Sequence, residues 1–284
     1  MEKIRIITES ASDMGTPERE DVTVLPMHIT FGEKEYLDGV NLSHQEFYNM
    51  LIESDELPKT SLISPGTFAD EFEKAEKAGE QVVVIVLSAK LSGTYQSAMV
   101  AAADYDNVTV VDSESVAVGE RILVDYALRL KDQGKTAAEI AEELETAKKK
   151  VHVIALLDTL EYLKKGGRIT PAAAALGTML RLKPVLQIHG EKLDAFAKVR
   201  TMNAAKRTMI DAIRSDLENR FAGQEMRLDV AHTNNKEAAL EFVKELEAEF
   251  PGYQVQRVDE LSLSVACHIG DGCLAVACSR VVEV

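Results

Sequence analysis

Cysteine is scarce in this chain and confined to one end of it. The 284 residues include three cysteines, Cys267, Cys273 and Cys278, all near the C-terminus. Three such cysteines do not make the disulfide framework of a small secreted domain, so we expect a reduced, cytoplasmic setting. Hydrophobic residues nevertheless make up 46% of the chain, which is enough to fill a core in one large or two medium domains.

Long apolar runs are also missing. No stretch of 18 uncharged apolar residues occurs, and the opening "MEKIRIITES" lacks the apolar segment of a signal peptide. We therefore expect a protein that is not membrane-integral.

Positive charge is in short supply. The chain has 32 Lys and Arg against 47 Asp and Glu, a net charge of −15. A surface this acidic repels nucleic acid and anionic membranes, so no nucleic-acid partner is expected, although a small anion can still bind in a locally basic pocket. The glycine-rich dinucleotide pattern and the P-loop lysine motif are both absent, and no cofactor is expected.

The first half of the chain alternates between strands and helices. Strands are expected at 4–8, 22–30, 82–87 and 107–113, and helices at 41–54, 64–79, after Gly93, at 118–133 and from Thr136. Capping boxes at Ser43/Glu46 and Thr136/Glu139, and the cap Ser64 before Pro65, support the helix starts. Continuous β-branched strands between amphipathic helices predict a three-layer α/β domain with a parallel sheet over residues 1–150.

The second half has a different pattern. Strands are expected at 151–156, 226–233 and 253–261, and after a glycine loop near the C-terminus. A hairpin is expected over 183–200 around His189-Gly190, and helices from Asp158, Pro171, Met202 and Asn235. We predict a two-layer α/β domain with a mixed sheet over residues 151–284 and a ligand between the two domains.

Hydroxyl groups follow the buried strand in "VVVIVLSAKLSGTYQSA". Ser92, Gly93 and Thr94 stand where this strand hands over to a helix. Ser92 could simply cap the helix, or the hydroxyls and the free N–H groups of the helix start could bind an anion. A nucleophilic serine is a third possibility, but "LSGT" lacks the turn motif that exposes a hydrolase serine.

Other candidates are spread along the chain. Thr60 and Ser61 lie in a polar loop without an evident structural role, and Arg168 follows two glycines. Arg200 ends the hairpin, and each arginine is either an anion ligand or a surface ion-pair partner. His268 precedes "IGDG", which is either a ligand-approaching loop or a tight turn.

Zinc is not expected at the C-terminal cysteines. Cys267, His268, Cys273 and Cys278 are close in sequence, but they contain no C-x-x-C pair. On a strand, Cys267 and His268 would also point to opposite faces. Buried cysteines acting as small apolar residues are the favoured interpretation, and no metal site is predicted.

Five motifs in order resemble the DegV family, which includes the fatty-acid-binding subunits of bacterial fatty acid kinase. They are "KTSLISPGTF", "LSAKLSGTYQSA", "LEYLKKGGRIT", "KVRT" and "HIGDG", and the resemblance covers nearly the whole chain. It implies two α/β domains with a long-chain fatty acid between them, the tail in an apolar tunnel. The carrier would present the carboxylate to a separate ATP-dependent kinase and have no catalysis of its own.

The resemblance also implies roles for individual residues. The residues that would bind the carboxylate are Thr60, Ser61, Ser92, Gly93, Thr94 and His268. Arg168 would lie near the head group and Arg200 toward the rim that faces the kinase. The chain departs from the family pattern with "TES" for T-D-S, "TSLIS" for T-S-Q-P-S, and Asp271 in place of proline in "HIGDG".

Two other functions remain open. One is a Ser-His hydrolase of acyl esters that uses Ser92 and His268, and the other is a binding module for a phosphorylated metabolite.

Overall fold

A computed structural model describes residues 2–54, 56–170, 182–188, 193–222 and 226–280. The chain divides into two compact units. Unit 1 comprises the described residues of Met1–Lys149 together with Ser262–Ser264, and unit 2 those of Lys150–Leu261 and Val265–Glu283. The predicted boundary between 150 and 151 stays a prediction. Among the described residues, no helix is both long and apolar enough to cross a membrane.

A four-stranded parallel sheet forms the centre of unit 1. Its strands, in spatial order, are β2 (Val22–Leu25), β1 (Ile4–Glu9), β6 (Gln81–Val86) and β7 (Val108–Asp112). Every pairing in it is parallel. Val82 to Val86 are fully buried, because helices cover both faces of the sheet. The predicted parallel-sheet α/β fold of this half is confirmed.

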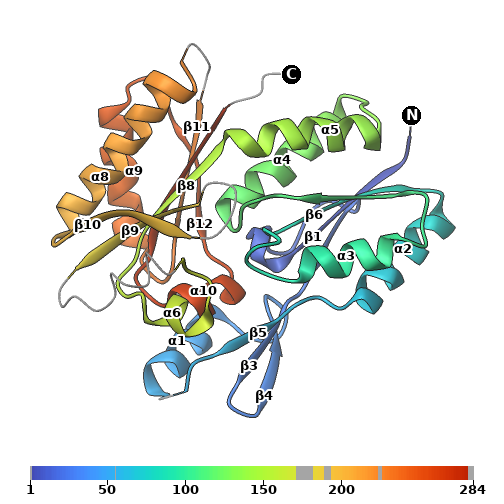
Figure 1. The fold of residues 1–284 in the computed structure, drawn as a ribbon, viewed down its shortest axis with the longest axis horizontal. Helices are drawn as coiled ribbons and strands as arrows, with labels where there is room; N and C mark the ends of the chain where they lie inside the picture. The colour runs from blue at the N-terminus through green and yellow to red at the C-terminus, as the bar shows by residue number, and fades with distance from the viewer. Residues whose placement is uncertain (1, 55, 171–181, 189–192, 223–225, 281–284) are drawn as a thin grey trace. The chain divides into compact units, whose positions relative to one another are not determined.

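Four helices cover this sheet in two pairs. They are α2 (Pro65–Ala78), α3 (Thr94–Ala102), α4 (Val118–Asp132) and α5 (Ala137–Ala147). Figure 1 shows α2 and α3 on one side of β1 and β6, and α4 and α5 on the other. The predicted caps are confirmed: Ser64 accepts the N–H of Thr67, and Thr136 and Glu139 form a capping box.

A small antiparallel sheet in unit 1 was not predicted. It consists of β4 (Lys34–Leu37), β3 (His28–Phe31) and β5 (Lys59–Ser61). The single strand expected at 22–30 is wrong, because the chain leaves the parallel sheet at Pro26, which has no N–H for a sheet ladder, and Met27, whose N–H donates to Ser10 Oγ.

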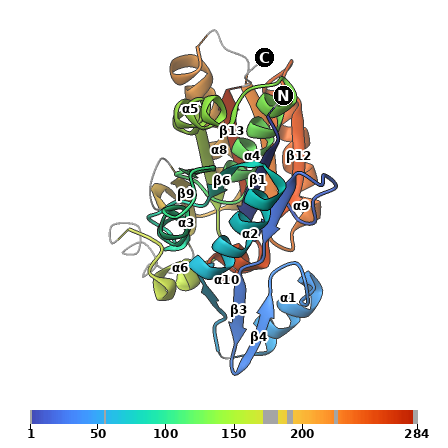
Figure 2. The ribbon, with the colours of Figure 1, turned by 90° about the vertical axis from the view of Figure 1, so that its right-hand side faces the viewer.

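One helix packs beside this small sheet. Helix α1 (His44–Glu53) has the predicted capping box and lies beside β3 and β4 (Figure 2). Phe47 of α1 meets Phe31 of β3 edge to face, with 6.4 Å between the ring centroids.

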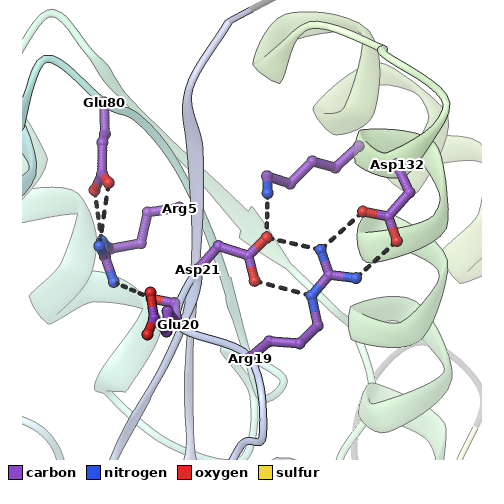
Figure 3. A network of polar contacts seen from close by, with 7 residues as sticks. Arg5, Arg19, Glu20, Asp21, Glu80 and Asp132 are labelled. Atoms are coloured by element: carbon purple, nitrogen blue, oxygen red, sulfur yellow. Dashed lines mark hydrogen bonds and ion pairs between the residues drawn. The ribbon is translucent and has the colours of Figure 1, made fainter.

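A charged network ties the edge of the parallel sheet to α4. Figure 3 shows the Arg19 guanidinium bridging Asp21 and Asp132, each through nitrogens 2.7 to 2.8 Å from carboxylate oxygens. Lys131 also contacts Asp21, and the hydrogen bonds from Arg19 lower the pKa of Asp21 despite its partial burial. Arg19 is 38% exposed, so the network contributes modestly to stability.

Unit 2 contains a six-stranded mixed sheet. Its strands, in spatial order, are β10 (Asp194–Val199), β9 (Lys183–Ile188), β8 (Val151–Leu156), β13 (Leu274–Arg280), β11 (Met226–His232) and β12 (Val255–Glu260). Only the β11–β12 pairing of these strands is parallel. The predicted mixed sheet is confirmed.

Two helices pack on one side of this sheet. They are α8 (Met202–Ser215) and α9 (Lys236–Glu249), seen together in Figure 1. Their apolar faces and the sheet form one core that includes Met209, Phe221 and Phe242. The helix expected from Met202 to Phe221 is α-helical only to Ser215 and continues as a π-helical turn, Asp216–Arg220.

Four short helical segments complete the described structure. They are the 3-10 turns Ser10–Ser12 and Lys148–Lys150, and the α-helices α6 (Glu161–Gly166) and α10 (Leu263–Ile269). Cys267 and His268 therefore lie on a helix, so the assumption that they belong to a strand is wrong. The helix expected from Pro171 and the turn at His189-Gly190 fall mostly or wholly outside the described residues.

Candidate functional site

The loop between β6 and α3 is held by hydrogen bonds of its own. The N–H groups of Leu91 and Ser92 donate to the carbonyl of Ser88, at 2.9 and 3.2 Å. Ser92 Oγ lies 2.9 Å from Thr94 Oγ1 and accepts the N–H of Thr94. The N-cap of α3 is Gly93 rather than Ser92, so Ser92 closes a local turn just before the N-cap.

A second segment runs close to this loop. A Cβ atom at Gly93 would lie 2.9 Å from Leu62 Cδ2, so the Leu62 side chain, which follows β5, packs directly against the Gly93 backbone. Within unit 1, the structure thus places the Thr60–Ser61 strand end in the neighbourhood of Ser92–Thr94. Thr60 is half-buried and Ser61 is exposed, and as successive strand residues they point to opposite faces of their small sheet.

The β6–α3 loop is also hydrogen-bonded to the end of β7 and the loop that follows it. The N–H of Ser88 donates to the carbonyl of Ser115 at 2.7 Å, and Asp112 Oδ1 accepts the N–H of Ala89 at 3.2 Å. Burial raises the pKa of Asp112 above its ordinary value. Because the β6 and β7 strands end side by side, their loops are cross-linked into one edge, as expected for a parallel sheet.

Two buried glutamates lie behind the same edge, and sequence reasoning did not find them. Glu9 ends β1 and Glu120 lies in the first turn of α4, and both are fully buried. Glu9 Oε1 accepts the N–H of Leu87 at 3.0 Å, and Thr8 Oγ1 donates to Glu120 Oε1 at 3.1 Å. Burial raises the pKa of Glu9 to about 7, and burial together with the charge of Glu9 raises that of Glu120.

A shared proton follows from this arrangement. The two carboxyl groups lie close together, and two like charges in a buried site cannot both ionise easily. The pair therefore holds one proton between its members near neutral pH. Glu9 is the glutamate of "TES", so the residue that departs from the T-D-S pattern is a member of this carboxyl pair.

In unit 2, His268 and Arg168 lie close together. His268 is near the end of α10, and a Cβ atom at Gly166 would be 3.0 Å from its Nδ1. Burial and, second, the charge of Arg168 lower the pKa of His268 to about 4. His268 is therefore neutral at pH 7, and Arg168, whose guanidinium donates to the Gly166 carbonyl, carries the positive charge of this pair.

The glycine loop after His268 packs against α6. A Cβ atom at Gly270 would lie 2.5 Å from the Tyr162 ring, and one at Gly272 would lie 3.2 Å from an Asp158 oxygen. Both glycines have positive φ, at 76° and 78°. Burial, then the charges of Glu161 and Asp271, raise the pKa of Tyr162, which places the Asp271 charge beside the Tyr162 ring.

Arg200 is separated from Arg168 within unit 2. Thr170, two residues after Arg168, donates to Asp194 at the start of β10, with 2.7 Å between oxygens. Arg200 follows the other end of β10, six residues and about 20 Å of extended chain away. Arg200 is exposed, which is compatible with a role at a rim rather than beside Arg168.

Asp38 is a further residue that the sequence did not single out. It is 4% exposed, and its two carboxylate oxygens accept the N–H groups of Leu263 and Ser264, at 3.1 and 2.9 Å. These residues open α10, so Asp38 caps the helix that later carries His268. A cap from a residue more than 220 positions away leaves no local sequence pattern.

The contacts of Ser92 and of the cysteines can be compared with the hydrolase, metal and anion-binding hypotheses. A hydrolase serine needs a base within hydrogen-bond reach, and the hydrogen bonds of the Ser92 side chain go to Thr94. All three cysteines are buried, and none of them is in a disulfide. Hydroxyls, a helix N-terminus and a turn with exposed backbone suit an acceptor-only group such as a carboxylate or phosphate.

Comparison with known proteins identifies relatives along the whole chain. A family model described as "Uncharacterised protein, DegV family" matches residues 3–281. Protein DegV of Bacillus subtilis is 30% identical over 278 residues, covering 96% of this chain and 98% of the relative.

Solved structures agree with this. A DegV family protein from Thermus thermophilus, described by its fatty acid binding, has 30% identity and a TM-score of 0.88, covering 98% of this chain and all of the other. A stearic-acid-binding protein from Eubacterium ventriosum has 27% identity and a TM-score of 0.88, covering 99% of this chain and 98% of the other.

Proposed function

This chain belongs to the DegV family, and from that premise we propose that it binds a long-chain fatty acid and presents the carboxylate to a separate kinase. The observation that carries the binding proposal is the match, over nearly the full length of both chains, to solved structures described as fatty-acid-binding proteins. Presentation to a kinase, the absence of catalysis by this chain and a cytoplasmic location are further parts of the proposal.

The carboxylate contacts are proposed to come from the β6–α3 loop of unit 1. Ser92 Oγ and Thr94 Oγ1 are 2.9 Å apart, so their mutual hydrogen bond uses one hydroxyl proton and leaves the other for a ligand. Gly93 is exposed and opens α3, where backbone N–H groups and the helix dipole favour an anion. Thr60 and Ser61 are proposed as the neighbouring hydroxyl donors.

The acyl tail is proposed to supply most of the affinity. About 15 methylene groups at about 0.8 kcal/mol each correspond to a gross gain of about 12 kcal/mol before ordering costs. A hydrogen bond to a charged group contributes about 1.5 to 3 kcal/mol. The head-group contacts therefore fix the orientation of the acid and tune an affinity that the tail dominates.

The charged residues of unit 2 are proposed to act on the transfer step. Phosphorylation of a carboxylate adds negative charge, so donors that meet this charge stabilise the product and transition state more than the bound acid. Arg168 would supply positive charge, and His268, neutral at pH 7, would supply an N–H donor rather than an ion pair. Arg200, exposed beyond the end of β10, would contact the kinase.

Extraction of the purified protein tests the binding proposal. Organic extraction followed by mass spectrometry is expected to yield a fatty acid of about one equivalent per chain, and delipidated protein is expected to rebind it. Preparations that contain no fatty acid and do not rebind one would contradict the proposal. Hydrolysis of a p-nitrophenyl acyl ester that is lost in Ser92→Ala would instead favour the hydrolase.

Acyl-phosphate trapping tests presentation. His268→Ala and Arg200→Ala are expected to bind fatty acid within about tenfold of the wild type, because the tail dominates affinity. Both should lose most hydroxylamine-trapped acyl phosphate when mixed with a cognate kinase and ATP, with Arg168→Ala intermediate. Lys198→Ala, which removes an exposed cation on β10 two residues before Arg200, is the control and should leave transfer intact. If His268→Ala and Arg200→Ala lost binding and transfer equally, presentation would be contradicted and the protein would only store the fatty acid.

A further inference from the structure

A histidine, an aspartate and a cysteine converge in unit 2. His152 on β8 and Cys278 on β13 are directly opposite one another in the antiparallel ladder, so their side chains leave the same face of the sheet. Asp216 stands at the first residue of the π-helical turn that follows α8. The three residues come from segments more than 60 positions apart, which is why no sequence motif marks them.

The three side chains meet atom to atom. His152 Nδ1 lies 2.6 Å from Asp216 Oδ2, and Cys278 Sγ lies 3.1 Å from the same oxygen. One ligand atom from each residue falls within 4.8 Å of the other two, and among the described residues this is the one such group of metal-ligand side chains. Cys278 is fully buried, and the side chains of His152 and Asp216 are only 8% and 13% exposed.

A fourth residue orients the histidine. His152 Nε2 lies 3.1 Å from Gln187 Oε1 on β9. An amide oxygen only accepts, so Nε2 carries a proton and Nδ1 is the atom directed at Asp216. Two lone-pair atoms 2.6 Å apart require a positive ion between them, either a proton or a metal ion. Metal-ligating histidines commonly have their other nitrogen held in this way.

The same geometry does not suit a cysteine nucleophile. In a Cys-His-Asp triad the thiol donates to the imidazole, and the carboxylate orients the imidazole from its other side. Here Asp216 lies between the sulfur and the imidazole nitrogen, so the thiol has an acceptor but the imidazole is not positioned to remove its proton for attack on a substrate.

We propose that His152, Asp216 and Cys278 form a zinc site that ties the end of α8 to the β8–β13 pair of unit 2. Sulfur, imidazole and carboxylate are the ligands that zinc takes, and a water molecule would complete the tetrahedron. Zinc–ligand bonds of about 2.0 to 2.3 Å require Asp216 to move away from His152 by less than about 1 Å. Binding releases two protons to solvent, the thiol proton and the proton between His152 Nδ1 and Asp216 Oδ2, as bonds from zinc to the three ligand atoms form.

Cobalt titration of the metal-free full chain tests this site. Co(II) is expected to produce the thiolate charge-transfer absorption of a tetrahedral sulfur-ligated ion, and added zinc should abolish it and raise the Tm. Cys278→Ser should lose the absorption, whereas Cys273→Ser, which removes another buried cysteine, should keep it. No absorption in the wild type, or the same absorption in Cys278→Ser, would mean that a proton occupies the gap.

A second variant keeps the test decisive if Cys278→Ser does not fold. Gln187→Leu leaves the three ligands in place and removes the acceptor of His152 Nε2. It is expected to weaken cobalt binding about 10- to 100-fold while preserving the shape of the absorption. Unchanged affinity in Gln187→Leu would contradict a metal bound through His152.

Discussion

The two units differ in how they hold their candidate functional residues. In unit 1, Ser92 and Thr94 hydrogen-bond to one another, and Gly93 between them is exposed. In unit 2, His268 and its loop are packed against α6, where Gly166 and Gly270 leave room for the His268 and Tyr162 side chains. Substitutions in the unit 1 loop should therefore change affinity, and those in unit 2 should first change stability.

Buried carboxyl groups show a parallel contrast. Glu9 and Glu120 face one another in unit 1, so the pKa of each is raised. Asp216 in unit 2 is also desolvated, but hydrogen bonds and the charge of His152 outweigh this and lower its pKa. Burial alone thus does not decide the charge of a carboxyl group; the neighbours do. Asp216 stabilises the fold down to acidic pH, whereas the glutamate pair destabilises it as pH rises.

The largest effect is expected at Asp216. Asp216→Ala removes the partner of both His152 and Cys278, and breaking a buried pair of this kind costs about 3 kcal/mol or more. Asp211→Ala removes an exposed carboxylate of α8, with 57% side-chain exposure, and should cost less than about 0.5 kcal/mol. Urea unfolding in the presence of a chelator compares the two, and equal losses would remove the contrast between the units.

Gly270→Ala should cost about 3 kcal/mol. The new Cβ would overlap the Tyr162 ring and the residue would keep a φ of 76°, so crowding and backbone strain add. Gly79→Ala, with a φ of 67° and nothing within 4 Å, isolates the strain and should cost about 1 kcal/mol. Thermal unfolding measures both. In a Tyr162→Ala background, the additional cost of Gly270→Ala should fall close to that of Gly79→Ala.

Ser92→Ala should weaken fatty-acid binding by about 10- to 150-fold, because a hydrogen bond to a charged group is lost. The loss of its turn should cost only about 1 kcal/mol of stability. Ser43→Ala, which removes the cap of α1 in the same unit, is the matched control and should lower stability alone. Titration of delipidated protein with a fatty acid decides: a lower Tm with unchanged affinity per folded molecule would make Ser92 purely structural.

Glu120→Gln should raise stability by about 1 kcal/mol at pH 8 and change it little at pH 5. Folded-state pKa values above the unfolded value of about 4.5 mean that the folded chain holds an extra proton, so stability falls as pH rises from about 5 past 7. The amide removes one of the two charges and can still accept from Thr8. Glu142→Gln, exposed on α5, should leave the pH profile of the Tm unchanged.

Local patterns in the sequence were sufficient for much of the fold. The caps at Ser43, Ser64 and Thr136 are where they were predicted, because a cap is a contact between residues two or three positions apart. The fully apolar run at 82–87 predicted a strand buried on both faces, since alternation disappears when both faces are covered. The five ordered motifs also indicated the family, because each of them is a continuous stretch of the chain.

Only the tertiary structure decided the rest. The break between β2 and β3 depends on Ser10 Oγ binding the N–H of Met27, and the start of α10 depends on Asp38. Glu9 with Glu120, and Asp216 with His152 and Cys278, are neighbours because strands and helices from distant segments pack together. The free energy of a local hydrogen bond can be read from adjacent residues, but the charge of a buried group depends on whatever the fold places beside it.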